Sequence, residues 1–224
     1  MQYSITCITC NNVVQKGIYN SMFYPNLLFM LSAFIVLAVI IAVFSIFATR
    51  RYHSCLKANS GHMESNCIPL MAAATVLGIG IGGFIDGIVL HQILQWHEML
   101  TNKLPADTLV NKSINMFWDG IFHLFTLITI IVGVFLLWNL LHKKNINTSK
   151  YLLWGGLSMG WGLFNLVEGI IDHHLLKLHN VREWSPDQEL WNYGFLIFGL
   201  LLIILGWYWQ KKGASNRSPF RPEV

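Results

Sequence analysis

Three short segments of the sequence share one pattern, an acidic residue followed by Gly and Ile, and they begin at Asp86, Asp119 and Glu168. Histidines follow the first and third acids at the same two spacings, five and eleven residues later: His91 and His97, then His173 and His179. Imidazole and carboxylate groups are typical ligands of Zn, Fe, Mn and Cu. The pattern therefore predicts a transition-metal site, and it indicates a weak parallel repeat of two helical hairpins.

The expected metal ligands are the acids and imidazoles that lie at a similar depth in three apolar segments: His91, Asp119, His123, Glu168, Asp172 and His173. Four further residues are expected to add to the site or only to support its ligands: Asp86, His97, His174 and His179. We expect His97 and His179 to contact solvent at the membrane interface. On an α-helix, His91 would lie about 140° from Asp86, so these two side chains should face different neighbours.

Three other interpretations of the same residues remain open. Two histidines on facing helices can ligate a haem iron, and His91 or His123 could pair with His173 in this way. Asp–His pairs can instead neutralise one another and hold helices in register. The same groups could also form a path for protons or ions across the membrane.

The composition indicates which kind of scaffold must position these residues. Hydrophobic residues make up 54% of the chain, charged residues only 12%, and the mean hydropathy is +0.49. A soluble domain carries about 25% charged residues, so this chain has too little charge to cover a water-facing surface. The composition excludes a soluble globular protein, a disordered chain and a nucleic-acid binder of the usual kind. It predicts an all-α integral membrane protein whose main partner is the lipid bilayer.

Five apolar segments are long enough to cross a bilayer as helices, and they cover approximately residues 22–48, 68–94, 117–140, 151–175 and 191–209. They predict a five-helix transmembrane bundle. One side of this topology carries ten Lys and Arg and the other carries five. Because basic residues concentrate on the cytoplasmic side, the N-terminus should lie outside and the C-terminus in the cytoplasm.

Two smaller patterns add to this picture. Cys7 and Cys10 form a CxxC pair on the predicted external side, which is typical of a redox pair, a soft-metal site or a simple disulfide. Glycines are spaced four residues apart at 78 and 82, 83 and 87, and 156 and 160. This spacing predicts bare helix faces on which neighbouring helices approach closely.

Residues 82–97 (GGFIDGIVLHQILQWH), 119–123 (DGIFH) and 165–183 (NLVEGIIDHHLLKLHNVRE) resemble the motifs of a bacterial family of predicted membrane proteins, domain of unknown function 2243. The resemblance covers about residues 70–210 and implies a four-helix membrane domain, here placed at residues 67–212. Residues 1–66 would add the CxxC segment, one helix and a cytoplasmic loop, and residues 213–224 a cytoplasmic tail. This N-terminal part is similar to small single-helix proteins found beside oxidase genes.

The resemblance implies a bacterial inner-membrane location and a link to copper-containing cytochrome oxidases, whose assembly factors accompany family members. Together with the ligand pattern, it favours a metal-dependent role in respiratory oxidase biogenesis or an associated redox step. Oxidase subunits or assembly factors would then be partners, and nucleic acid would not. The alternatives are a haem-binding membrane subunit, a proton or ion transporter, and a structural subunit of a respiratory complex. Whether the protein is an enzyme stays open.

Overall fold

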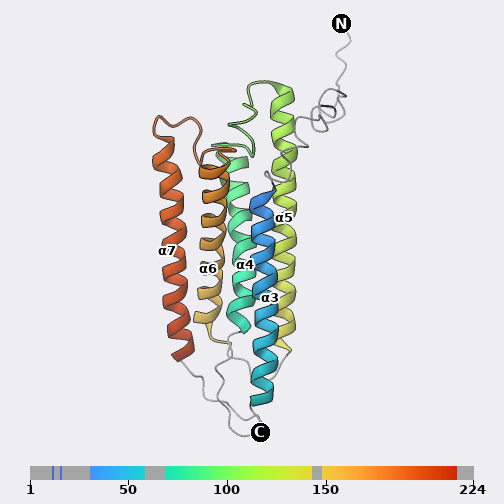
Figure 1. The fold of residues 1–224 in the computed structure, drawn as a ribbon, viewed down its shortest axis with the longest axis vertical. Coiled ribbons are helices and arrows are strands. Elements are labelled where there is room, and N and C mark those ends of the chain that lie inside the picture. The colour runs from blue at the N-terminus through green and yellow to red at the C-terminus, as the bar shows by residue number, and fades with distance from the viewer. Residues whose placement is uncertain (1–11, 13–15, 17–30, 59–68, 143–147, 216–224) are drawn as a thin grey trace.

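The computed structural model describes residues 12, 16, 31–58, 69–142 and 148–215. Within these ranges the chain forms long helices and no strand. The five α-helices, drawn in Figure 1, are α3 (Ser32–Ala58), α4 (Pro69–Asp86), α5 (Leu109–Leu141), α6 (Lys150–Glu168) and α7 (Gln188–Ser215). The expectation of an all-helical protein is therefore confirmed for the part of the chain that the structure describes.

In the part of the chain that the structure describes, three helical segments are both long and apolar enough to cross a membrane: Leu70–Ile93, Leu109–Leu141 and Gln188–Ala214. The apolar part of α3, Ser32–Ile46, is shorter. Apolar side chains also face outward, and on α5 Ile131, Phe135 and Trp138 are each more than half exposed. Such a surface is stable only against another apolar medium, as lipid would provide. The crossing of the bilayer by all five helices, and the direction in which they cross, stay predictions.

Helix α4 lies at the centre of the bundle, where it packs against α3, α5 and α6, and α7 packs against the other side of α6. Glycines make the closest of these contacts possible. A Cβ atom added to Gly78 would collide with the backbone of Leu157 on α6, and one added to Gly160 would collide with the carbonyl oxygen of Thr75 on α4. The predicted close approach of glycine-bearing helix faces is thus confirmed for α4 and α6.

Helices α4 and α6 each continue without a break into a seven-residue π-helix, η3 (Gly87–Ile93) after α4 and η4 (Gly169–Leu175) after α6. Both π-helices begin at the Gly that follows the repeated acid. Beyond each π-helix, one residue adopts a left-handed conformation with φ 49°, Gln95 in the first copy and Lys177 in the second. The two halves of the sequence repeat therefore fold into the same unusual backbone.

The π-helices correct one prediction about side-chain direction. Asp86 and His91 were expected to face different neighbours, yet Asp86 Oδ2 lies 3.4 Å from His91 Nε2. In the second copy, Glu168 Oε1 lies 3.6 Å from His173 Nε2. The prediction was wrong because it assumed α-helical geometry. A π-helix closes i→i+5 hydrogen bonds, and this wider turn brings residues five apart onto one face.

The segments that follow the two π-helices lie at the same end of the bundle (Figure 1). One connects η3 to α5 and carries His97, and the other connects η4 to α7 and carries His179. They are tied together by backbone hydrogen bonds, from Asn102 N–H to Leu178 O (2.9 Å) and from Glu183 N–H to Trp96 O (3.0 Å). The fold thus closes one end of the bundle with two interlocked connections, each bringing a histidine.

Candidate metal centre

Six buried side chains form one cluster where the π-helices meet the connections. Three groups within it have ligand atoms within 4.8 Å of one another: His91, His97 and His179; Glu168, His173 and His179; and Asp86, His91 and Glu168. His91, Glu168 and His179 each belong to two groups, so the three groups are continuous. All six side chains are buried. The repeated acid and the two histidines that follow it, from both copies, therefore make up the whole cluster.

His91 is oriented by a carboxylate on a neighbouring helix. Its Nδ1 lies 2.9 Å from Asp119 Oδ1 on α5. The same oxygen accepts a hydrogen bond from the backbone N–H of Met99 at 2.9 Å. An ionised carboxylate only accepts hydrogen bonds, so the proton of the neutral imidazole is on Nδ1 and the lone pair is on Nε2. Asp119 therefore directs the His91 lone pair into the cluster and is not itself in any of the three groups.

His97 and His179 are oriented by each other's connection. His97 Nδ1–H donates to the carbonyl oxygen of Val181 at 2.8 Å, and His179 Nδ1–H donates to that of Met99 at 3.0 Å. Val181 and Met99 are themselves at corresponding positions, two residues after each histidine. The exchange is reciprocal, as expected for two copies related by a local twofold arrangement. It fixes both rings in the tautomer that leaves a lone pair on Nε2.

The Nε2 atoms of His91 and His97 lie 3.0 Å apart. Two lone pairs at this distance repel each other unless a cation or a proton lies between them. In a tetrahedral zinc site, with Zn–N bonds of about 2.0–2.1 Å, two coordinating nitrogens are about 3.3 Å apart. The observed separation is close to that value. The rings of His97 and His179 stack at 4.5 Å, which brings the third imidazole to the same place.

The carboxylates of the cluster lie near the imidazoles. Even so, several polar atoms of the cluster have no hydrogen-bond partner among the described residues. Glu168 Oε1 lies 3.5 Å from His179 Nε2 and 3.6 Å from His173 Nε2. Among the described residues, no hydrogen-bond partner exists for Asp86 Oδ2, Glu168 Oε2, His179 Nε2 or either ring nitrogen of His173. A buried polar atom without a partner costs about 1–3 kcal/mol. Several such atoms in one cluster indicate a missing positively charged ligand.

The two copies differ at one position that matters for the site. His91 Nδ1 is held by Asp119, but the corresponding His173 Nδ1 has no partner, and its ring lies 5.2 Å from that of Phe195 on α7. Helix α7 carries neither an acid nor a histidine at this depth. The cluster is therefore better organised around His91, His97 and His179 than around His173.

The electrostatic surroundings differ for the two histidines on the connections. Burial and the neighbouring imidazoles hold the pKa of His97 well below its usual range. Burial also acts to lower the pKa of His179, but the Glu168 carboxylate more than offsets it, so that pKa is raised. His97 is consequently neutral at neutral pH. The pKa of His179 is instead raised by the Glu168 carboxylate beside it.

The structure places the other predicted site residues around the cluster. His123 Nδ1–H donates to its own helix at Asp119 O (2.6 Å), and its ring covers the bare surface of Gly87. Asp172 is buried, with Oδ1 unpaired, and His174 lies 5.0 Å from the Tyr193 ring. None of these three belongs to the groups found among the described residues. Cys7 and Cys10 lie outside the described residues.

The expectation that His97 and His179 contact solvent was wrong. Their side chains are only 3% and 0% exposed, because the two connections fold over the end of the bundle and cover them. The residues that fasten the connections were missed by the sequence analysis. Asn115 Oδ1 accepts Leu100 N–H at 2.8 Å, and Asn192 Oδ1 accepts Val181 N–H at 3.0 Å. Their sequence signal was weak, because both amides lie in the polar opening turns of their helices, near Lys112 and Ser113 in α5 and near Gln188 and Glu189 in α7.

Comparison with known proteins gives one family match. The family model described as a predicted membrane protein, DUF2243, matches residues 73–213. This range includes every residue of the cluster. No curated protein and no solved structure matches the chain.

Proposed function

This chain belongs to the DUF2243 family of predicted membrane proteins, and we propose that it is a metal-dependent membrane protein with a transition-metal centre at the closed end of its bundle. The ligands would be Nε2 of His91, His97 and His179 together with a carboxylate oxygen of Glu168. Asp86 and His173 are near enough to complete the coordination or to hold a second ion, because the three groups overlap.

One observation carries this proposal: three buried imidazoles use Nδ1 for fixed acceptors, and the three residues offer ligand atoms within 4.8 Å of one another. Histidines that bind metal in proteins are held in this way, with the other ring nitrogen donating to a carboxylate or a carbonyl. A structural ion pair would need only one acid for each histidine. Here each of the three rings has its own orienting acceptor, and the lone pairs converge in addition.

The set of ligands limits the chemistry. Imidazole and carboxylate donors suit Zn, Fe, Mn and Cu, and they include no thiolate that would select a softer metal. When bound, such an ion would supply Lewis-acid or redox chemistry. The chain's own residues would hold the ion, orient the imidazoles and exclude water. Phe122, which stacks on His91 at 5.5 Å, and Phe164, which stacks on Phe122, form an apolar wall beside the ligands.

Two alternative occupants of the cluster remain outcomes of the test. A proton between His91 Nε2 and His97 Nε2 would also relieve their repulsion at 3.0 Å, as a proton-conducting protein would require. A haem on His91 is less favoured, because His97 Nε2 lies 3.0 Å from His91 Nε2 and occupies the space in which a porphyrin bound to His91 would lie. The role in respiratory oxidase biogenesis is a further part of the proposal, supported by the family resemblance of the sequence alone.

The test is to purify the protein in mild detergent without chelator and to measure metals by mass spectrometry and the visible spectrum on one sample. We expect one or two equivalents of a transition metal and no Soret band. His97→Ala, His179→Ala and Glu168→Gln should each lower metal affinity by at least about tenfold. His142→Ala is the matched control, because His142 is exposed at the end of α5.

Metal-free protein with a correctly folded spectrum would refute the metal proposal and favour the proton alternative. A Soret band that disappears in His97→Ala would replace the metal ion with haem. Full metal content in all three cluster variants would show that the metal binds elsewhere.

A further inference from the structure

A pocket of about 570 Å³ lies beside the metal cluster, between the α4–η3 helix and α7, with α6 as its floor. Five of the residues that line it are aromatic: Trp96, Trp161, Trp191, Phe195 and Phe198. Helices α4 and α7 both pack on α6, and the pocket lies between them. Its volume is within the range of about 300–1,000 Å³ that is usual for sites binding small organic molecules.

The mouth of the pocket faces the direction in which lipid would lie. Ile85, Val89, Leu190 and Phe198 line it and are each at least about a third exposed. The first two belong to the candidate membrane span Leu70–Ile93 and the other two to Gln188–Ala214. A molecule dissolved in the bilayer could therefore enter sideways, between η3 and α7, without crossing a polar surface.

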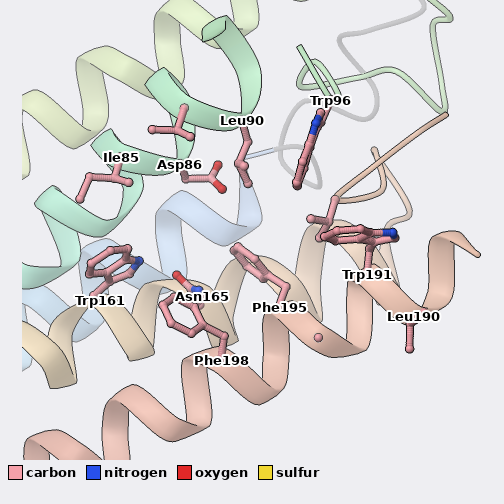
Figure 2. A pocket seen from close by; sticks show the side chains of 13 residues that line it. Ile85, Asp86, Leu90, Trp96, Trp161, Asn165, Leu190, Trp191, Phe195 and Phe198 are labelled. Carbon is pink, nitrogen blue, oxygen red and sulfur yellow. The ribbon is translucent and has the colours of Figure 1, made fainter. Parts of the chain in front are cut away.

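The inner part of the pocket contains two buried hydrogen-bond acceptors. Among the described residues, Asn165 Oδ1 has no hydrogen-bond partner and its residue is 1% exposed, while Asp86 is 5% exposed and its Oδ2 has no hydrogen-bond partner but lies 3.4 Å from His91 Nε2. Figure 2 shows the Asp86 carboxylate and the Asn165 amide among the apolar and aromatic side chains between η3 and α7. A hydroxyl group on a bound molecule would satisfy either oxygen and remove the cost of leaving it unpaired.

We propose that this pocket binds a membrane-soluble amphiphile whose aromatic head carries a hydroxyl group. The aromatic walls suit a flat ring, since offset and edge-to-face ring contacts are favourable. The hydroxyl donates to Asn165 Oδ1 or to the Asp86 carboxylate, and the apolar tail extends toward the lipid. The Asp86 carboxylate in the lining disfavours an anionic head beside it, and Arg182, which lies over the Trp96 and Trp191 rings, is not itself in the lining.

The pocket and the metal cluster share Asp86, which is also in the group with His91 and Glu168. The hydroxyl of the bound molecule therefore lies next to the proposed ion. That the amphiphile is the substrate of the metal centre rests on the proposed function, whereas its binding in the pocket does not.

The chain offers a matched pair of variants for the test. A Cβ added to Gly194, which lines the pocket, meets no atom within 4 Å, and the same is true of Gly120 on α5, which does not line it. Gly194→Leu should therefore fill the pocket without disturbing the backbone. Gly120→Leu places the same side chain on another exposed helix position. Asn165→Leu is a further variant that keeps the side-chain size and removes an acceptor.

Binding is measured by native mass spectrometry of the full chain, with 4-nonylphenol as the probe and nonylbenzene, which has no hydroxyl, as its control. We expect one phenol per chain and about tenfold or more weaker binding of nonylbenzene, as for loss of a hydrogen bond to a buried acceptor. Gly194→Leu should abolish phenol binding and Gly120→Leu should retain it. Asn165→Leu should weaken phenol binding about tenfold and leave nonylbenzene binding unchanged.

Equal affinity for the two probes, or phenol binding that Gly194→Leu and Asn165→Leu leave unchanged, would overturn the inference. Metal content is measured on the same samples. Phenol binding without metal would refute the proposed function and keep the pocket, and metal without phenol binding would refute the pocket alone.

Discussion

Asp119 provides the sharpest test of how the metal centre is organised. It is buried, it contacts His91 Nδ1 and the Met99 N–H through one oxygen at 2.9 Å each, and it lies outside all three ligand groups. Asp119→Asn keeps the shape and an acceptor oxygen but removes the negative charge. Mutation of the group that orients a metal-binding histidine typically lowers metal affinity by about 10–100-fold. This corresponds to about 1.4–2.7 kcal/mol of binding free energy.

Asp119→Ala should have a second effect that Asp119→Asn does not. It leaves both the His91 Nδ1–H and the Met99 N–H buried without an acceptor, and each such group costs about 1–3 kcal/mol. We therefore expect Asp119→Ala to lower the thermal unfolding midpoint of the metal-free protein, whereas Asp119→Asn should change mainly the metal affinity. The difference between the two variants separates the orienting role from a purely structural one.

The assay is competition for the bound metal against a chelator of known affinity, with circular dichroism to confirm folding. Asp107→Asn is the control, since Asp107 lies in the connection that carries Met99, is exposed, and accepts a hydrogen bond from the Asn111 side chain. If Asp119→Asn binds metal as tightly as the wild type while His91→Ala loses it, Asp119 does not orient His91 and this reasoning is wrong.

Three further predictions concern packing, the connections and the metal. Gly160→Ala should sharply reduce the yield of folded protein in a fluorescence-detected gel-filtration assay, because its methyl group would collide with Thr75 O. Gly120→Ala, whose methyl group meets open space, should not reduce the yield, and equal yields of the two variants would contradict the packing. Asn192→Leu should destabilise the protein by about 1–3 kcal/mol, since it leaves the Val181 N–H without its acceptor, and a thermal melt without any shift would count against that role. Removing the metal with a chelator should lower the free energy of unfolding by about 2.7 kcal/mol, relative to protein in free metal at 100 times its dissociation constant, as measured by denaturant unfolding. An unchanged unfolding curve would mean that no metal is bound to the folded state.

The sequence by itself determined the kind of protein and gave the six residues of the cluster as candidates. Low charge and long apolar segments indicate membrane helices, since there is no other way to place so many apolar side chains. The repeated acid and its histidines at two fixed spacings identified all six cluster residues as candidates. The glycine spacing also predicted bare helix faces for close approach. These features depend on composition and on local sequence patterns, which a single chain displays directly.

The tertiary structure alone decided which of those candidates come together in the cluster and which lie around it. Asp119 and His91 are distant in the sequence, and only the packing of α5 against η3 shows that the carboxylate holds Nδ1. His97 and His179 are on segments that look solvent-exposed, and they are buried because each connection supplies a carbonyl oxygen to the histidine of the other. Such reciprocal contacts cannot be read from either segment by itself.

The π-helices are a second, more local feature that only the tertiary structure decided. On an α-helix, Asp86 and His91 would point in different directions, and nothing in the local sequence requires the wider turn that places them 3.4 Å apart. A single π-turn is less favourable than an α-turn for most sequences. The π-helix occurs here where an acid and a histidine of one helix must both lie in one buried cluster. The surroundings, and not the local sequence, therefore determine whether the segment is an α-helix or a π-helix.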